Sequence, residues 1–256
     1  MLLAVDIGNT NITLGAFREN ELVFTARLAT DRGLTDDQYA VQLSDMLALN
    51  KADAEDFIGA IISSVVPALT SAMSNAVRRV TGVESLVVGP GVKTGLNILI
   101  DDPPQTGADL VAVSVAAKAK YPCPNVVCDL GTASTITVLD RNGNFIGGVI
   151  YPGVRTSLNA LVENTSLLHG ISFDAPAHVV GRNTIECMQS GVMFGAASLL
   201  DGMIARIERE LGEPVTAIAT GGLSRVIIDH CDRHFEYCEN LILEGLKMIY
   251  DRNIDR

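Results

Sequence analysis

Two short apolar runs, each ending in an Asp and a glycine turn, mark equivalent points in the two halves of the chain. Residues 2–5 lead into Asp6-Ile7-Gly8-Asn9-Thr10, and residues 126–128 lead into Asp129-Leu130-Gly131-Thr132. A second run of β-type composition follows each turn. Apolar runs of this length that are bounded by turn residues are typical of buried strands. The pattern therefore predicts that a strand delivers an acidic side chain to a tight turn in each half.

The remaining hydrophobic pattern predicts a similar order of elements in both halves. The first half is expected to run strand, strand, strand, helix, strand, helix, strand, and the second half to repeat this plan. In the first half we expect strands at 11–17, 21–28, 58–66 and 85–88, a capped helix that starts at Thr35, and a helix at 69–80. In the second half we expect strands at 125–128, 134–140, 144–150 and 215–219, and helices at 156–162, 183–211 and 241–250.

Two acidic glycine turns of this kind suit the phosphate chain of a nucleotide. Glycine lets backbone N–H groups approach phosphate oxygens, Asn and Thr side chains donate hydrogen bonds, and an Asp holds a cation or its water. A single Asp-x-Gly-polar sequence is more simply a hairpin corner. The repetition of this sequence at the same place in both halves favours a phosphate site.

Charge and composition narrow the functional classes. The chain has 256 residues and a net charge of −11, which argues against a general nucleic-acid or anionic-membrane surface, because those partners require clustered Lys and Arg. No apolar run reaches the roughly 18 residues needed to span a bilayer, and the chain begins directly with a core strand instead of a leader. We expect a cytoplasmic protein that binds no nucleic acid and no membrane.

An irregular stretch between the halves carries a third candidate acid. Residues 101–109 contain too many acids and prolines for a regular element, and Leu110 begins an apolar segment typical of a buried helix. Asp109 is therefore expected at a helix start. Its role is either that of a helix cap or that of a functional carboxylate.

Several of these segments resemble the motifs of a known family. Asp6 to Thr10, Asp129 to Ala133 and Thr220-Gly221-Gly222 resemble the phosphate 1, phosphate 2 and adenosine motifs of the acetate and sugar kinase, Hsp70 and actin superfamily. Gly107-Ala108-Asp109 and the segment 147–153 resemble type III pantothenate kinase, and the likeness runs from Met1 to about Asn253.

The resemblance implies an α/β protein with a duplicated ribonuclease H-like fold, in which lobes at 1–118 and 119–256 flank a cleft. It implies phosphorylation of pantothenate by ATP in the first step of coenzyme A synthesis, by a homodimer that requires magnesium and a monovalent cation, potassium or ammonium. Asp109 would be the proton acceptor, Asp6 would orient magnesium through water, and Asp129 would hold the monovalent cation. The implied ATP contacts are Asp6, Ile7, Gly8, Asn9, Thr10, Asn11, Ile12, Thr13, Thr132, Gly221 and Gly222. The implied pantothenate contacts are Ile100, Gly107, Ala108, Asp109, Leu110 and Thr184.

Two positions depart from the family pattern in the acceptor half of this site. Leu110 stands where the family has Arg, and Ile100 stands where it has Tyr. Pantothenate carries a carboxylate, and a charge-assisted hydrogen bond to it contributes about 1.5 to 3 kcal/mol. Arg155 is a candidate replacement cation, although a solvated arginine is the simpler interpretation.

Three alternatives remain beside an active pantothenate kinase. The chain could be a non-catalytic, nucleotide-binding regulatory member with a degenerate acceptor site, a kinase for another small alcohol, or a phosphatase of the same fold. The apolar side chains of the helix at 183–211 exceed the needs of one amphipathic face, so they could line a subunit interface or be buried within the monomer.

Overall fold

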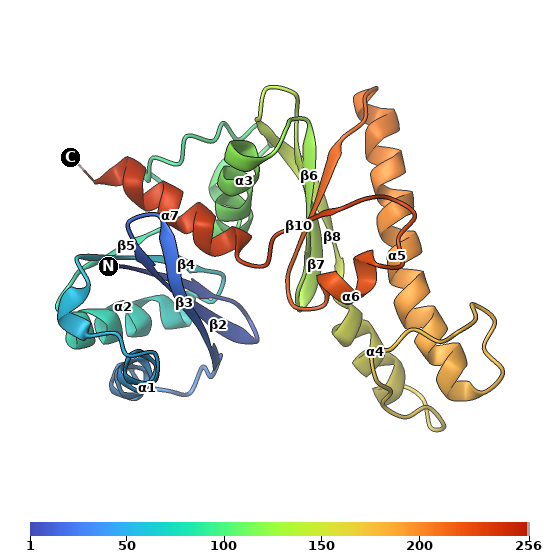
Figure 1. The fold of residues 1–256 in the computed structure, drawn as a ribbon, viewed down its shortest axis with the longest axis horizontal. Helices are drawn as coiled ribbons and strands as arrows, with labels where there is room; N and C mark the ends of the chain where they lie inside the picture. Colours follow the sequence, from blue (N-terminus) through green and yellow to red (C-terminus); the bar gives the residue numbers. More distant parts are fainter. Residues whose placement is uncertain (255–256) are drawn as a thin grey trace. The chain divides into compact units, whose positions relative to one another are not determined.

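The computed structural model describes residues 1–254, and their contacts group into two compact units. Unit 1 comprises Met1–Leu96, Asp101–Ala116 and the segment that begins at Leu241. Unit 2 comprises Asn97–Ile100 and Ala117–Asn240. Each unit contains a five-stranded mixed sheet with helices (Figure 1). The expected α/β architecture with two related sheets is therefore confirmed.

Unit 1 is built on a sheet with the strand order β3-β2-β1-β4-β5. The strands β1 to β3 form an antiparallel meander, and β4 and β5 continue the sheet in parallel with β1. The elements of this unit, in chain order, are β1 (Leu2–Ile7), β2 (Asn11–Arg18), β3 (Glu21–Ala29), α1 (Asp36–Leu49), η1 (Ala54–Asp56), β4 (Gly59–Ser64), α2 (Pro67–Thr81), β5 (Ser85–Val87), η2 (Pro103–Gln105), most of α3 (Ala108–Lys120), and α7 (Leu241–Asn253).

Local sequence explains where these helices begin and end. Thr35 and Gln38 form a reciprocal capping box at the start of α1, as its sequence predicts. Pro67 occupies the first turn of α2. N–H groups in the first turn have no partner within the helix, so a residue without an N–H costs nothing there. Gly82 ends α2 in the left-handed conformation, which glycine adopts without steric cost.

The two faces of the first sheet are covered by different helices. Leu3, Val5 and Ile7 of β1 pack into one core with side chains of α1 and α2. α7 lies on the opposite face, where it contacts β1 and β4 (Figure 1). Its Gly245 faces the backbone of Ala112 in α3 so closely that a Cβ atom there would collide with the Ala112 carbonyl oxygen. Because side chains alternate along a strand, Asp6 belongs to the face that α7 covers.

Unit 2 is built on a sheet with the strand order β10-β9-β6-β7-β8, in which β6 takes the central position that β1 has in unit 1. Its elements are β6 (Asn125–Leu130), β7 (Ala133–Leu139), β8 (Phe145–Pro152), α4 (Val154–Glu163), α5 (Thr184–Leu211), β9 (Thr216–Thr220), α6 (Ser224–Ile228) and β10 (Glu236–Tyr237). The second half thus has one helix more than the plan of the first half.

The long helix α5 packs as a core element of unit 2 (Figure 1). Four of its side chains enter the core beneath Val126 and Cys128 of β6: Met193, Ala197, Leu200 and Ile204. Within residues 1–254, α5 is the one helix whose length and composition would allow it to cross a membrane, and 28% of the relevant window is buried. Asn183 caps its first turn and Gly212 ends it, in agreement with the predicted range.

The contacts divide the chain differently from the expected division after residue 118. The first unit ends within α3, and α7 joins unit 1 although it follows the last strand of unit 2. The sequence predicts that one face of α7 is buried, but its pattern does not specify which sheet covers that face.

Candidate active site

Asp6 lies at the end of the central strand of unit 1, between two hydroxyl side chains. It pairs in register with Thr13 of the antiparallel neighbour β2 and with Ser63 of the parallel neighbour β4. Residues paired in register on adjacent strands share a face of the sheet, so the two hydroxyls flank the carboxylate. Ser63 is fully buried, and its Oγ has no hydrogen-bond partner within residues 1–254. The Asp6 carboxylate thus lies in a row of polar side chains, between Thr13 and Ser63, next to the turn.

The turn after Asp6 exposes polar groups and buries apolar ones. Ile7 and Ile12 have no exposed surface, so their side chains are not accessible to a ligand. Asn9, Thr10 and Asn11 are exposed. The turn is closed by a hydrogen bond of 3.0 Å from the Gly8 N–H to the Asn11 carbonyl oxygen.

Asp129 occupies the corresponding place in unit 2. It pairs in register with Thr135 of β7 and with Thr220 of β9, so hydroxyl side chains again flank the carboxylate on both sides. Thr135 Oγ1 is buried and lacks a hydrogen-bond partner within the described part of the chain. Gly221 has a φ of 95°, and a Cβ atom at this position would lie 2.5 Å from Asp129 Oδ1. Glycine is therefore required where the adenosine motif passes Asp129.

The second turn is fixed by the segment that follows β8. The Thr132 carbonyl oxygen accepts one hydrogen bond of 3.0 Å from the Gly153 N–H and another of 2.7 Å from Thr156 Oγ1. A Cβ atom on Gly153 would collide with the carbonyl oxygens of Gly131 and Thr132. Thr132 itself is exposed, and Gly222 has open space around it.

Asp109 lies in the first turn of α3, in agreement with the expected helix start. Its Oδ1 accepts a hydrogen bond of 2.8 Å from the Leu110 N–H. Burial raises the pKa of the Asp109 carboxyl, and the hydrogen bond from Leu110 opposes this rise. A Cβ atom on Gly107 would collide with Asp109 Oδ1, so the small residue at 107 keeps space for the carboxylate. The local geometry therefore suits a partly buried proton acceptor.

The other expected acceptor residues are divided between the units. Gly107, Ala108 and Leu110 are half-buried around the start of α3 in unit 1. Ile100 belongs to a short segment of unit 2 that pairs with Phe145 through a hydrogen bond of 2.8 Å from the Leu99 N–H. Thr184 is the exposed first residue of α5 in unit 2.

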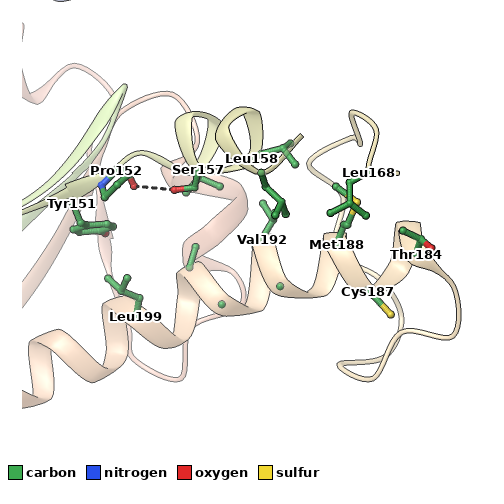
Figure 2. A pocket seen from close by; sticks show the side chains of 15 residues that line it. Tyr151, Pro152, Ser157, Leu158, Leu168, Thr184, Cys187, Met188, Val192 and Leu199 are labelled. Carbon is green, nitrogen blue, oxygen red and sulfur yellow. Dashed lines mark hydrogen bonds between the residues drawn. The ribbon is translucent and has the colours of Figure 1, made fainter. Parts of the chain in front are cut away.

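Thr184 also lines an apolar cavity of about 650 Å³ between α4 and α5. Figure 2 shows Tyr151 and Leu199 at one end of this cavity, Thr184 at the other, and Leu158, Val192 and Met188 between them. Burial raises the pKa of Tyr151 to about 12, so its hydroxyl stays neutral. The cavity offers mainly apolar contact.

Comparisons with known proteins assign the family. The sequence profile of the family described as type III pantothenate kinase matches residues 2–206. A type III pantothenate kinase from Exiguobacterium sp. is 41% identical over 99% of both chains. The chain belongs to the type III pantothenate kinase family.

Solved structures with little sequence identity share the fold of this family member. A 2-dehydro-3-deoxygalactonokinase-like protein from Sinorhizobium meliloti superposes with a TM-score of 0.64 at 14% identity, over 100% of this chain and 98% of that one. The activator of 2-hydroxyisocaproyl-CoA dehydratase from Clostridium difficile, solved with bound ADPNP, superposes with a TM-score of 0.60 at 12% identity, over 100% and 98% of the two chains.

Arg155, the candidate replacement cation, does not line the cavity beside Thr184. Its guanidinium lies over the ring of Phe173, with 4.7 Å between the guanidinium carbon and the ring centroid. Arg155 is exposed and lies in the first turn of α4. Stacking on an aromatic ring leaves the edge of a guanidinium available for hydrogen bonds, so the contact leaves the proposed role of Arg155 open.

Several residues that contact the two turns were not predicted from the sequence. Thr30 and Arg32 contact the first turn, and Thr156 contacts the second. These residues follow the third strand of each meander, so the repeated strand order was the only available signal. The roles expected for the motif residues stay predictions.

The raised pKa of Asp109 predicts a pH-dependent stability difference. A carboxyl whose folded-state pKa is raised destabilises the folded protein at a pH above that pKa, and this cost disappears below the ordinary Asp pKa of about 3.9, where the group is protonated in both states. Asp109→Asn should therefore raise the midpoint of thermal unfolding at about pH 7, and the gain should shrink as the pH approaches the ordinary value.

Asp101→Asn, at an exposed position in the same irregular stretch, is the control for this measurement. Equal midpoints for wild type and Asp109→Asn at neutral pH would contradict the burial argument.

Proposed function

We propose that this protein transfers the γ-phosphoryl group of ATP to pantothenate, the first step of coenzyme A biosynthesis, in the cytoplasm. The observation that carries the proposal is family membership over nearly the whole chain, at 41% identity to a relative named type III pantothenate kinase. Phosphoryl transfer to an alcohol depends mainly on positioning and on neutralising phosphate charge. The two turns and Asp109 supply residue types suited to these tasks.

The donor set supports one carboxylate for each cation. Within residues 1–254, no three His, Cys, Asp or Glu side chains cluster as a metal site, so a cation must also use hydroxyl, carbonyl, water or phosphate oxygens. Magnesium commonly binds in this way, through one or two carboxylates and the substrate phosphates. Asp6 is assigned to magnesium through water. Asp129 is assigned to potassium or ammonium, and Thr135 Oγ1 beside it offers a buried oxygen that lacks a protein partner within that range. Bound cations neutralise the charge of the triphosphate.

ATP is assigned to the two turns and the adenosine motif. From Asp6 to Thr13 the contacts come from exposed side chains and from the backbone, since Ile7 and Ile12 are buried. Thr132 meets the phosphates from unit 2. Gly221 and Gly222 give the nucleoside an approach without side chains.

Asp109 is assigned as the proton acceptor. Its carboxylate takes the proton from the pantothenate hydroxyl, the hydroxyl oxygen forms a bond to the γ-phosphorus, and the bond between that phosphorus and the β-γ bridging oxygen breaks to release ADP. A general base works best when its pKa lies near the working pH, so the raised pKa of Asp109 suits this step. Ile100, Gly107, Ala108, Leu110 and Thr184 are assigned to pantothenate.

A homodimer is supported by the apolar surface around α4 and α5. Large apolar side chains in this region are exposed: Leu161 by 41%, Leu167 by 86%, Val180 by 80%, Ile185 by 59% and Leu199 by 38%. Two of them, Leu161 and Leu199, line the apolar cavity between α4 and α5, and Figure 2 shows Leu199 at one end of it. Exposed apolar side chains beside an apolar cavity are typical of protein interaction sites. We assign it to a second copy of the chain.

The direct test of the proposed reaction is a coupled assay of ADP release with ATP and magnesium, with and without pantothenate and potassium or ammonium. Turnover that requires pantothenate is expected, and Asp109→Asn should lower kcat by at least about a hundredfold. Nucleotide binding without turnover would instead support a non-catalytic member. Turnover only with another alcohol would support a different kinase.

Leu110 and Arg155 test how the pantothenate carboxylate is bound. Leu110→Arg is expected to lower the Michaelis constant for pantothenate about tenfold, because it adds a charge-assisted hydrogen bond. Arg155→Ala is expected to raise the same constant, while the Michaelis constant for ATP stays constant in both variants. Arg209→Ala, at an exposed position near the end of α5, is the control. If neither variant changes the Michaelis constant for pantothenate, Arg155 does not take the place of the family's arginine at position 110.

The dimer is tested by a charge in the apolar surface. Leu199→Glu should convert a dimer to a monomer in sedimentation velocity at low micromolar concentration, because the buried carboxylate would lose its hydration without gaining a partner. Val41→Glu, at a position of unit 1 with 61% exposure, should leave the dimer intact. A monomeric wild type, or a dimer that survives Leu199→Glu, would contradict the assignment.

A further inference from the structure

The segment after β3 bonds to the first turn at three points. Thr30 Oγ1 donates a hydrogen bond of 2.7 Å to the Gly8 carbonyl oxygen, and the Thr30 N–H donates one of 3.0 Å to the Thr10 carbonyl oxygen. Two residues later, Arg32 Nη2 donates one of 3.0 Å to Asn9 Oδ1. The segment thus contacts three consecutive residues of the turn that is assigned to the ATP phosphates.

The bonds from Thr30 determine which backbone groups of the turn remain available. A turn that binds phosphate must present its N–H groups and turn its carbonyl oxygens away, because carbonyl and phosphate oxygens repel each other. Thr30 binds the carbonyl oxygens of Gly8 and Thr10. Loss of the hydroxyl donor would leave the Gly8 carbonyl free to rotate toward the ligand.

Arg32 brings a positive charge to the turn. The guanidinium is exposed, and its bond to Asn9 Oδ1 fixes the amide of Asn9 so that Nδ2 is directed away from the arginine. The sequence contains no Gly-x-x-x-x-Gly-Lys-Ser/Thr motif, so no P-loop lysine can neutralise the triphosphate. A guanidinium suits phosphate because its N–H groups form paired hydrogen bonds with phosphate oxygens.

A buried anchor holds the segment between these two residues. Tyr39 has no exposed surface. Its hydroxyl donates a hydrogen bond of 2.7 Å to the Asp31 carbonyl oxygen and accepts one of 3.1 Å from the Asp31 N–H. Asp31 Oδ1 accepts a further hydrogen bond of 2.8 Å from the Gly33 N–H. Thr30 and Arg32 therefore flank a residue, Asp31, whose backbone is held by the buried Tyr39 hydroxyl.

The second turn has a similar hydroxyl contact but a different arginine environment. Thr156 Oγ1 donates to the Thr132 carbonyl oxygen, as Thr30 Oγ1 does to that of Gly8. Arg155, next to Thr156, lies over Phe173. The guanidinium of Arg32, in contrast, hydrogen-bonds Asn9 of the first turn.

We propose that Thr30 and Arg32 are positioning residues of the first phosphate turn, and that Arg32 also binds the triphosphate. Thr30 keeps the carbonyl groups turned away from the ligand, and Arg32 orients the Asn9 amide and supplies the positive charge. This inference rests on the proposed function, because it takes ATP as the ligand of the turn.

The test measures ATP affinity by calorimetry, and steady-state kinetic constants, for the wild type and four variants. Arg32→Gln should weaken ATP binding about tenfold and reduce its dependence on salt, and Arg32→Lys should restore part of the affinity and most of the salt dependence. Thr30→Val should lower kcat/KM for ATP about tenfold, and Thr30→Ser should restore it. The Michaelis constant for pantothenate and the midpoint of thermal unfolding should stay at their wild-type values.

Two matched controls come from the same sheet. Arg18→Gln changes an exposed arginine at the far end of β2, and Thr25→Val changes an exposed threonine within β3. Both should behave as wild type. If Arg32→Gln and Thr30→Val match these controls, or if they lower the unfolding midpoint and impair both substrates alike, the inference is wrong while the proposed function stands. If the wild type neither binds ATP nor phosphorylates pantothenate, the proposed function itself has failed.

Discussion

A carboxylate and a phosphate group repel each other unless a cation or directed N–H groups separate them, and the proposed phosphate site must meet this constraint at both turns. The chain carries a net charge of −11 and has no P-loop lysine. Asp6 and Asp129 each end the central strand of a sheet, with hydroxyl side chains in register on both sides. Each carboxylate thus lies between neutral hydroxyl side chains on the neighbouring strands.

Close backbone packing makes this arrangement possible. Gly221 passes Asp129 where any side chain would collide, and Gly153 packs against the carbonyl groups of the second turn. In unit 1, α7 approaches α3 through Gly245, and α3 carries Asp109 in its first turn. Protein interiors are packed so densely that one added methyl group displaces its neighbours. Gly221 therefore leaves room for the Asp129 carboxylate, whereas Gly153 and Gly245 allow close backbone packing at the second turn and at α3.

Sequence patterns predicted the strands β1 to β9, the capped start of α1 and the position of Asp109 at a helix start, because hydrophobic period and capping residues act locally, whereas the two-residue strand β10 was not predicted. They did not predict that α7 joins the first sheet, since an amphipathic helix does not specify its partner. They also missed Thr30 and Arg32, whose bonds to the turn span 22 and 23 positions along the chain and arise only once the meander has formed. The motif residues were recognisable by resemblance, whereas the residues that hold the motif in shape depend on tertiary packing.

The most direct test is a crystal structure with ADPNP, magnesium and pantothenate. The account predicts that the nucleotide phosphates contact the N–H groups of both turns, that Asp6 lies within reach of the magnesium shell, and that the pantothenate hydroxyl meets the Asp109 carboxylate. Phosphates bound away from either turn, or a carboxylate of Asp6 or Asp129 directed away from every bound cation, would contradict it.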